Sequence, residues 1–103
     1  MKRLFIIQLL KGKTSDEIKS ERDLAVKEAE KVLKEPVEII DYSFGDFNPA
    51  EVKPLWFLSK SLELLSTADI IYFGKDWDKY KCSKMENLIA KEYGIRIIEY
   101  NDK

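Results

Sequence analysis

With 103 residues, 45% of them hydrophobic, the chain is long enough for one domain with a hydrophobic core. Its 18 basic and 19 acidic residues give a formal net charge of -1, which argues against a nucleic-acid backbone or an anionic membrane surface as the main partner. The chain has no histidine and one cysteine, Cys82, which excludes Ser–His–Asp and Cys–His catalysis, an internal disulfide and a zinc cage.

The single cysteine suits a reducing compartment, so we expect a cytoplasmic protein. The apolar start, Met1 to Leu10, is too short for a signal peptide with a cleavage site and too short to span a bilayer. Any acid–base chemistry must come from carboxylates, tyrosines or lysines, because no histidine is present.

The first two predicted elements are a buried strand and an amphipathic helix. The strand is predicted at Arg3–Leu10, a nearly continuous apolar run that suits burial on both faces. The helix is predicted from Ser15 to about Lys34, where Pro36 stops it. Thr14 and Glu17 have the spacing of a capping box at its start.

The middle of the chain continues the alternation. A second strand is predicted at Val37–Tyr42, followed by a loop at Ser43–Lys53. A second helix is predicted from Pro54 through Thr67, because proline suits the first turn of a helix. A third strand at Ile70–Phe73 leads into a polar, aromatic loop at Gly74–Cys82.

The last elements complete a βαβαβαβ pattern. Ser83 is predicted to cap a third helix of about ten residues, closed by Gly94 in a left-handed conformation, and Ile95–Glu99 forms the last strand. The pattern predicts one domain over residues 1–103. It is an α/β fold with helices on both faces of a four-stranded parallel sheet in the order 2-1-3-4.

A candidate site follows from this topology. Ligands of such sheets bind beyond the carboxyl ends of the strands, where the winding direction reverses, here between the first and third strands. Residues 8–13, residues 74–82 and Glu86 in the first turn of the third helix should meet there. A carboxylate at a helix start is favoured in its ionised form and can act as a nucleophile at an acetal carbon. The plainer alternative is an ordinary helix-start glutamate.

Two other motifs have both a chemical and a plain interpretation. Gly12-Lys13-Thr14 is similar to the end of a phosphate-binding P-loop, but Ile7 stands where that motif needs a glycine. A loop glycine, a solvated lysine and a helix-capping threonine are therefore preferred. Ser61, on or beside the leucine stripe of the second helix, either reaches a ligand or allows close packing.

The loop after the third strand also has two interpretations. Aromatic rings bracketed by acids can stack a nucleobase and bond its edge, or the rings can simply pack over the helix ends. The residues concerned are Asp76, Trp77, Asp78 and Tyr80.

Several short motifs occur together in this chain, namely GKT at 12–14, KPLW at 53–56, AD at 68–69, and Glu86 followed by IAKEYG at 89–94. With these motifs the chain resembles a small family of unknown function that is grouped with the nucleoside 2-deoxyribosyltransferases. The resemblance covers nearly the whole chain, to the end of the last predicted helix. It implies a flavodoxin-like (Rossmann-like) three-layer fold.

The resemblance also implies a chemistry. Glu86, with Ala90 and Gly94 after it, matches the family's nucleophilic glutamate, which forms a glycosyl ester that a base or water then releases. The position of the family's base-contacting aspartate falls near Ser61, and that of a second aspartate at Tyr80. In the related enzymes, residues from a neighbouring subunit complete each active site.

Three hypotheses remain open from the sequence. The first is an N-glycoside hydrolase or deoxyribosyltransferase-like enzyme without cofactor or metal, acting on a nucleoside or nucleotide with Glu86 as nucleophile. The second is a non-catalytic nucleotide-binding module with the same pocket, and the third is a partner-binding domain. The expected substrate-binding residues are Gln8, Gly12, Ser61, Asp76, Trp77, Asp78 and Tyr80.

Two further expectations concern surfaces. Glu86 should open onto a cleft formed with Gln8 and the Gly74–Cys82 loop, where the helix start would lower its pKa and burial beside Trp77 would raise it. We expect a homodimer or larger assembly, because a small sheet cannot easily cover all of the aromatic side chains in the middle of the chain, and exposed apolar patches usually mark interfaces. These side chains are Trp56, Phe57, Phe44 and Phe47.

Overall fold

A computed structural model describes residues 1–8, 13–40 and 53–100 of the chain. The elements follow the predicted alternation, with one short 3-10 turn, η1, added before the last helix. They are β1 (Lys2–Ile7), α1 (Ser15–Leu33), β2 (Val37–Ile39), α2 (Pro54–Leu65), β3 (Ile70–Phe73), η1 (Trp77–Lys79), α3 (Lys81–Glu92) and β4 (Arg96–Glu99).

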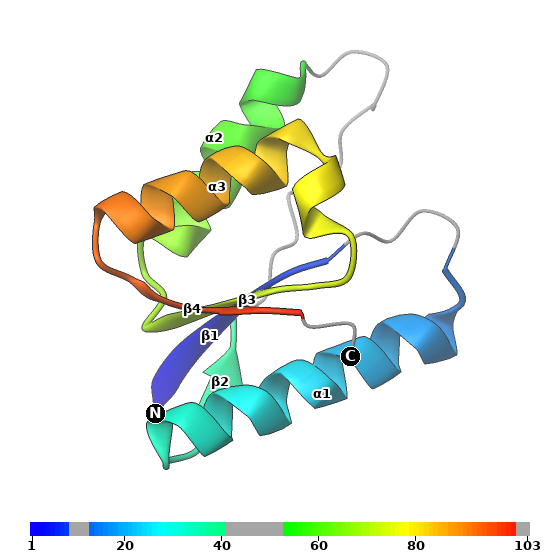
Figure 1. The fold of residues 1–103 in the computed structure, drawn as a ribbon, viewed down its shortest axis with the longest axis vertical. Coiled ribbons are helices and arrows are strands. Elements are labelled where there is room, and N and C mark those ends of the chain that lie inside the picture. Colours follow the sequence, from blue (N-terminus) through cyan, green and yellow to red (C-terminus); the bar gives the residue numbers. More distant parts are fainter. Residues whose placement is uncertain (9–12, 41–52, 101–103) are drawn as a thin grey trace.

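The four strands form one parallel sheet in the order β2-β1-β3-β4. Helix α1 lies against one face of the sheet, and α2 and α3 lie side by side over the other (Figure 1). The predicted three-layer, flavodoxin-like α/β fold is therefore confirmed, strand order included. The chain changes its winding direction between β1 and β3, which are neighbours in the sheet.

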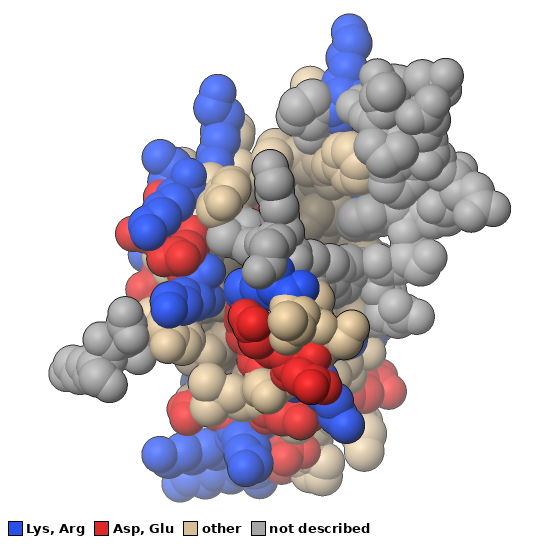
Figure 2. Space-filling view, turned by 90° about the vertical axis from the view of Figure 1, so that its right-hand side faces the viewer, with Lys and Arg blue, Asp and Glu red and all other residues tan. Residues whose placement is uncertain are grey.

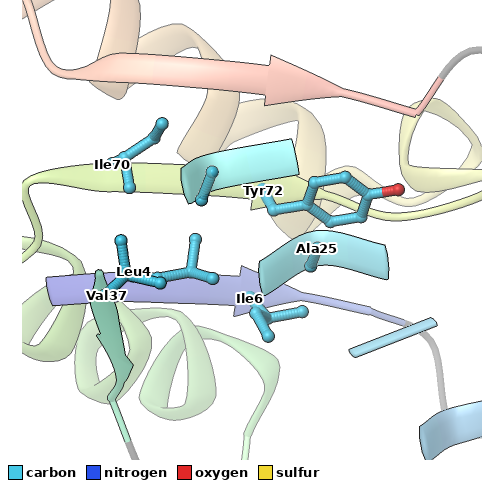
Figure 3. Close-up of a cluster of buried hydrophobic side chains, with 7 residues drawn as sticks. Leu4, Ile6, Ala25, Val37, Ile70 and Tyr72 are labelled. Atoms are coloured by element: carbon cyan, nitrogen blue, oxygen red, sulfur yellow. The ribbon is translucent and has the colours of Figure 1, made fainter. Parts of the chain in front are cut away.

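Each face of the sheet has its own apolar core, because successive side chains of a strand point to opposite faces. Leu4 and Ile6 of β1 pack with Tyr72 of β3 beneath α1, where Ala25 allows the helix to approach closely (Figure 3). Phe5 and Ile7 point the other way, into the core under α2 and α3. Burial on both faces explains why the central strands read as unbroken apolar runs.

Local signals determine the ends of α1. The Thr14 hydroxyl accepts a hydrogen bond from the backbone N–H of Glu17 at 3.1 Å and donates to the carboxylate of the same residue at 3.3 Å. The N-cap half of the predicted capping box is therefore present, whereas its reciprocal bond, from the backbone N–H of Thr14 to the Glu17 carboxylate, is not formed among the described residues. The helix ends at Leu33, and Lys34 takes a left-handed conformation with φ 59° ahead of Pro36.

The predicted start of the third helix is wrong. Helix α3 begins at Lys81, with Tyr80 in extended backbone at the N-cap position and no side-chain cap. Ser83 therefore does not cap the helix; it is buried. Buried residues recur along α3 at helical spacing, so packing against the rest of the protein, rather than a capping side chain, determines where this helix begins. The buried residues of α3 are Ser83, Glu86, Asn87 and Ala90.

Smaller differences concern the other boundaries. Strand β2 ends at Ile39, short of the predicted Tyr42, which lies outside the described residues. Helix α2 ends at Leu65 and not at Thr67, whose hydroxyl donates to the carbonyl of Leu64. Gly94 does adopt the predicted left-handed conformation after α3, with φ +70°.

The surface carries charges of both signs. On the face in Figure 2, acidic and basic side chains are interspersed, consistent with the balanced composition. Within the described ranges, no helix is both long enough and apolar enough to cross a membrane.

Candidate functional site

A cavity of about 180 Å³ opens beside the carboxyl end of β1, under α2 and α3. This is the edge of the sheet where the winding direction changes, and where ligands of such folds bind. The described residues that line it come from three elements and are Phe5, Ile6, Ile7, Gln8, Phe57, Leu58, Ser61, Cys82, Ser83 and Glu86. Glu86 and Gln8 therefore share a cleft, as predicted, but of the Gly74–Cys82 loop expected to complete it only Cys82 is among the described lining residues.

Glu86 provides the only carboxylate among those lining residues. Only 4% of the residue is exposed, and the Ser61 hydroxyl donates a hydrogen bond to its Oε2 atom at 2.9 Å. Within the described residues, no hydrogen bond reaches its Oε1 atom. One carboxylate oxygen is thus held in place and the other is available to a ligand.

Burial raises the pKa of Glu86 from its ordinary 4.5 to about 7, and the Ser61 hydrogen bond opposes this rise only in part. Glu86 is the sixth residue of α3, so the prediction that it lies in the first turn is wrong. The helix start therefore does not provide the expected stabilisation of its charge, since that effect fades beyond the first turn. Of the two opposing influences expected on this pKa, burial is the stronger.

Gln8 follows the last residue of β1 and has an incomplete set of hydrogen bonds. Its Nε2 atom donates a long bond of 3.5 Å to the backbone carbonyl of Ile18. Its buried Oε1 atom has no hydrogen-bond partner among the described residues. A buried acceptor without a partner costs free energy, so this oxygen favours a ligand that brings a donor.

The remaining predicted site residues do not join this cavity. Trp77 packs against Phe73, with ring centroids 5.3 Å apart, as part of the core under α2 and α3. Asp76 forms an ion pair with Lys79 at 3.2 Å, whereas Asp78 and Tyr80 are exposed. None of Asp76, Trp77, Asp78 and Tyr80 is among the described lining residues, and Gly12 lies outside the described residues.

Lys13 differs from the expected solvated lysine. Its ammonium group pairs with Oε2 of Glu21 on α1 at 2.6 Å, and the two side chains are only 19% and 11% exposed. A Cβ atom at Gly74 would collide with the Glu21 carboxylate, so glycine at the end of β3 makes room for this ion pair. With its charge neutralised in this way, Lys13 is poorly suited to hold a phosphate.

Sequence reasoning placed Cys82 within a segment expected at the site, but it missed Ser83 as a lining residue of the cavity. A signal for Ser83 did exist, because it precedes Glu86 by three residues and so shares its helix face. In the described part of the chain, the cavity included, no group of three or more Cys, Asp and Glu side chains is arranged to hold a metal ion.

The aromatic residues behind the expected assembly are partly covered. Trp56 and Phe57 are half-buried and meet edge to face, with ring centroids 5.4 Å apart. Phe44 and Phe47 lie outside the described residues. The expected homodimer or larger assembly stays a prediction.

Together, the fold and cavity define a flavodoxin-like α/β protein with a buried carboxylate at the strand ends. Comparison with protein-family models, with curated proteins and with solved structures finds no match for this chain. The functional argument therefore depends on the geometry of the site.

Replacing Ser61 with alanine tests the electrostatics of the cavity. Because the Ser61 hydrogen bond lowers the pKa of Glu86, its loss should raise that pKa above about 7. Titration of the Glu86 side chain by carboxyl-carbon NMR measures the change directly. Ser83→Ala is the matched control, since Ser83 lines the same cavity but has no described bond to Glu86. An unchanged midpoint in Ser61→Ala would contradict the hydrogen-bond assignment.

Proposed function

We propose that the protein is a cytoplasmic N-glycoside hydrolase or deoxyribosyltransferase-like enzyme that acts on a nucleoside or nucleotide, with Glu86 as its nucleophile. One observation carries the proposal. A nearly buried carboxylate lies in a strand-end cavity, with Oε2 held by Ser61 and Oε1 without a described partner. This is the arrangement that a positioned carboxylate nucleophile requires.

The reaction would proceed in two displacements. In the first, Oε1 of ionised Glu86 bonds to the anomeric carbon as the bond from that carbon to the base nitrogen breaks, and the base leaves with the electron pair. In the second, water or another base attacks the same carbon and the carboxylate leaves. The departing base takes up a proton from solvent in the first displacement, and the attacking water or base gives one back to solvent in the second. The negative charge stabilises the oxocarbenium-like transition states between these steps, as in retaining glycosidases. Both steps balance without an organic cofactor or a metal ion.

The size of the cavity limits which part of the substrate it encloses. Its volume of about 180 Å³ is below the range of about 300–1,000 Å³ typical for complete drug-sized ligands. The cavity therefore suits a sugar ring, with the base or phosphate outside it. Gln8 lines the cavity, and its side-chain amide would form hydrogen bonds with a sugar hydroxyl there. The described lining contains no Lys or Arg, which favours a neutral group within the cavity.

The pH dependence of base release tests this proposal. Only ionised Glu86 can attack, so kcat/KM should rise with pH through about 7 and level off above it. The assay is nucleobase release from nucleosides and 5′-monophosphates, with a chelator present. A rate that falls as pH rises through the same region would show that protonated Glu86 is required, and would overturn the nucleophile assignment.

A non-catalytic nucleotide-binding module is the second candidate, and the raised pKa of Glu86 favours it. At a pKa of about 7, much of the carboxyl group is protonated at neutral pH and can donate a hydrogen bond to a ligand. This alternative predicts that nucleosides or nucleotides raise the melting temperature while no base is released.

A further inference from the structure

The outer face of α3 has an apolar centre and charged ends. Met85 and Leu88 are 44% and 61% exposed at the middle of the helix. Lys81 and Glu92, the first and last residues of α3, are exposed on the same side. The four are spaced by four, three and four residues, which is the spacing of a coiled-coil seam. This seam lies opposite the buried face of α3 that carries Glu86.

An apolar hollow adjoins one end of this seam. It has a volume of about 220 Å³ and is bounded by Leu55 and Leu58 of α2 and by Lys81, Cys82 and Met85 of α3. Leu55 is itself 72% exposed, so the apolar surface extends from α3 onto the start of α2. A leucine side chain presented by another helix could enter such a hollow, as a knob enters a hole.

The charges at the ends of the seam specify its partner. If a second α3 crosses antiparallel about a two-fold axis at the middle of the helix, Met85 lies opposite the partner's Leu88. Lys81 then lies opposite the partner's Glu92, and the same contacts occur twice. A parallel pair would instead place like charges together at both ends. Neither Lys81 nor Glu92 forms an ion pair with another described residue, so both are available.

We propose that the α3 seam is the self-complementary interface of an antiparallel, two-fold symmetric dimer of this chain. Leu88 of each protomer enters the hollow of its partner, and Lys81 pairs with the partner's Glu92. Two lysines, Lys84 and Lys91, flank the seam, but Lys91 is already paired with Glu99 at 3.3 Å. The seam is only 12 residues long, so we expect a dimer in the micromolar range. This inference is independent of the proposed chemistry.

A charge swap tests the proposal. Lys81→Glu and Glu92→Lys each turn two attractive pairs into repulsive ones, so each should weaken dimerisation by about tenfold or more. The double variant Lys81→Glu/Glu92→Lys should restore it. Leu88→Glu should leave a monomer at every concentration examined. Sedimentation velocity between about 1 and 500 µM measures these changes, spanning the weak range expected for a small interface.

All three positions are exposed, so each variant should keep the circular dichroism spectrum and melting temperature of the wild-type monomer. Lys19→Glu on the exposed side of α1 is the matched control, because it changes net charge equally and should leave dimerisation unchanged. A wild-type monomer throughout the concentration range would overturn the proposal. So would a dimer insensitive to both single charge reversals, or a double variant no stronger than the single ones.

Discussion

Glu86→Gln is expected to abolish base release, with a loss of roughly a thousandfold or more in kcat. Glutamine keeps the size of the side chain and an oxygen that can accept the Ser61 hydrogen bond. It has no negative charge with which to attack the anomeric carbon or to stabilise the transition state. Ligand binding should change little, because the sugar contacts remain. The measurements are single-turnover base release and ligand-induced stabilisation in parallel.

Glu63→Gln is the matched control for this substitution. Glu63 is an exposed glutamate of α2, outside the cavity, so the same chemical change there should leave turnover unaltered. Wild-type turnover that persists in Glu86→Gln would disprove the mechanism. If the wild-type protein binds nucleosides but releases no base, the enzyme hypothesis is wrong and the nucleotide-binding module takes its place.

Glu86→Gln should also stabilise the protein at pH 8 and above. The unfolded carboxyl group loses its proton near pH 4.5, whereas the folded one keeps it up to about pH 7. Between these values the unfolded chain binds fewer protons, so rising pH favours unfolding. The difference in pKa corresponds to about 3 kcal/mol of lost stability above pH 7. Glutamine is neutral at every pH and avoids this cost.

For a domain of this size, that free energy corresponds to a gain of about 10–20 °C in melting temperature at pH 8. The gain should shrink steadily between pH 7 and pH 4.5 and vanish below, where wild-type Glu86 is protonated in both states. Thermal unfolding of both proteins between pH 4 and pH 9 measures it, with Glu63→Gln expected to show no such pH-dependent gain. If the difference in melting temperature between wild type and Glu86→Gln does not change with pH, the pKa of Glu86 is not raised in the folded protein. Stability lost to a charged group in a cavity is typical of functional sites.

Several parts of the candidate site could be predicted without coordinates. Gln8 follows an apolar strand, and the carboxyl ends of central strands meet at the ligand-binding edge of such sheets. Its place in the cavity is therefore a consequence of chain order. Trp77 was less predictable, because an aromatic residue after a strand can either face a ligand or pack against the core. Its contact with Phe73 depends on the 3-10 turn that redirects the loop.

The sequence by itself determined the layers of this protein and their order. Strands that are buried on both faces and alternate with helices leave few topologies for a parallel sheet. The N-cap residue Thr14 locates the start of α1 to within a residue. These signals are local, or follow from the handedness of crossovers. Only the tertiary structure decided where α3 begins, because the packing of Ser83, Asn87 and Ala90 against the sheet outweighs any capping side chain. It also decided the pKa of Glu86, since that value depends on how much water α2 and β1 exclude from the cavity.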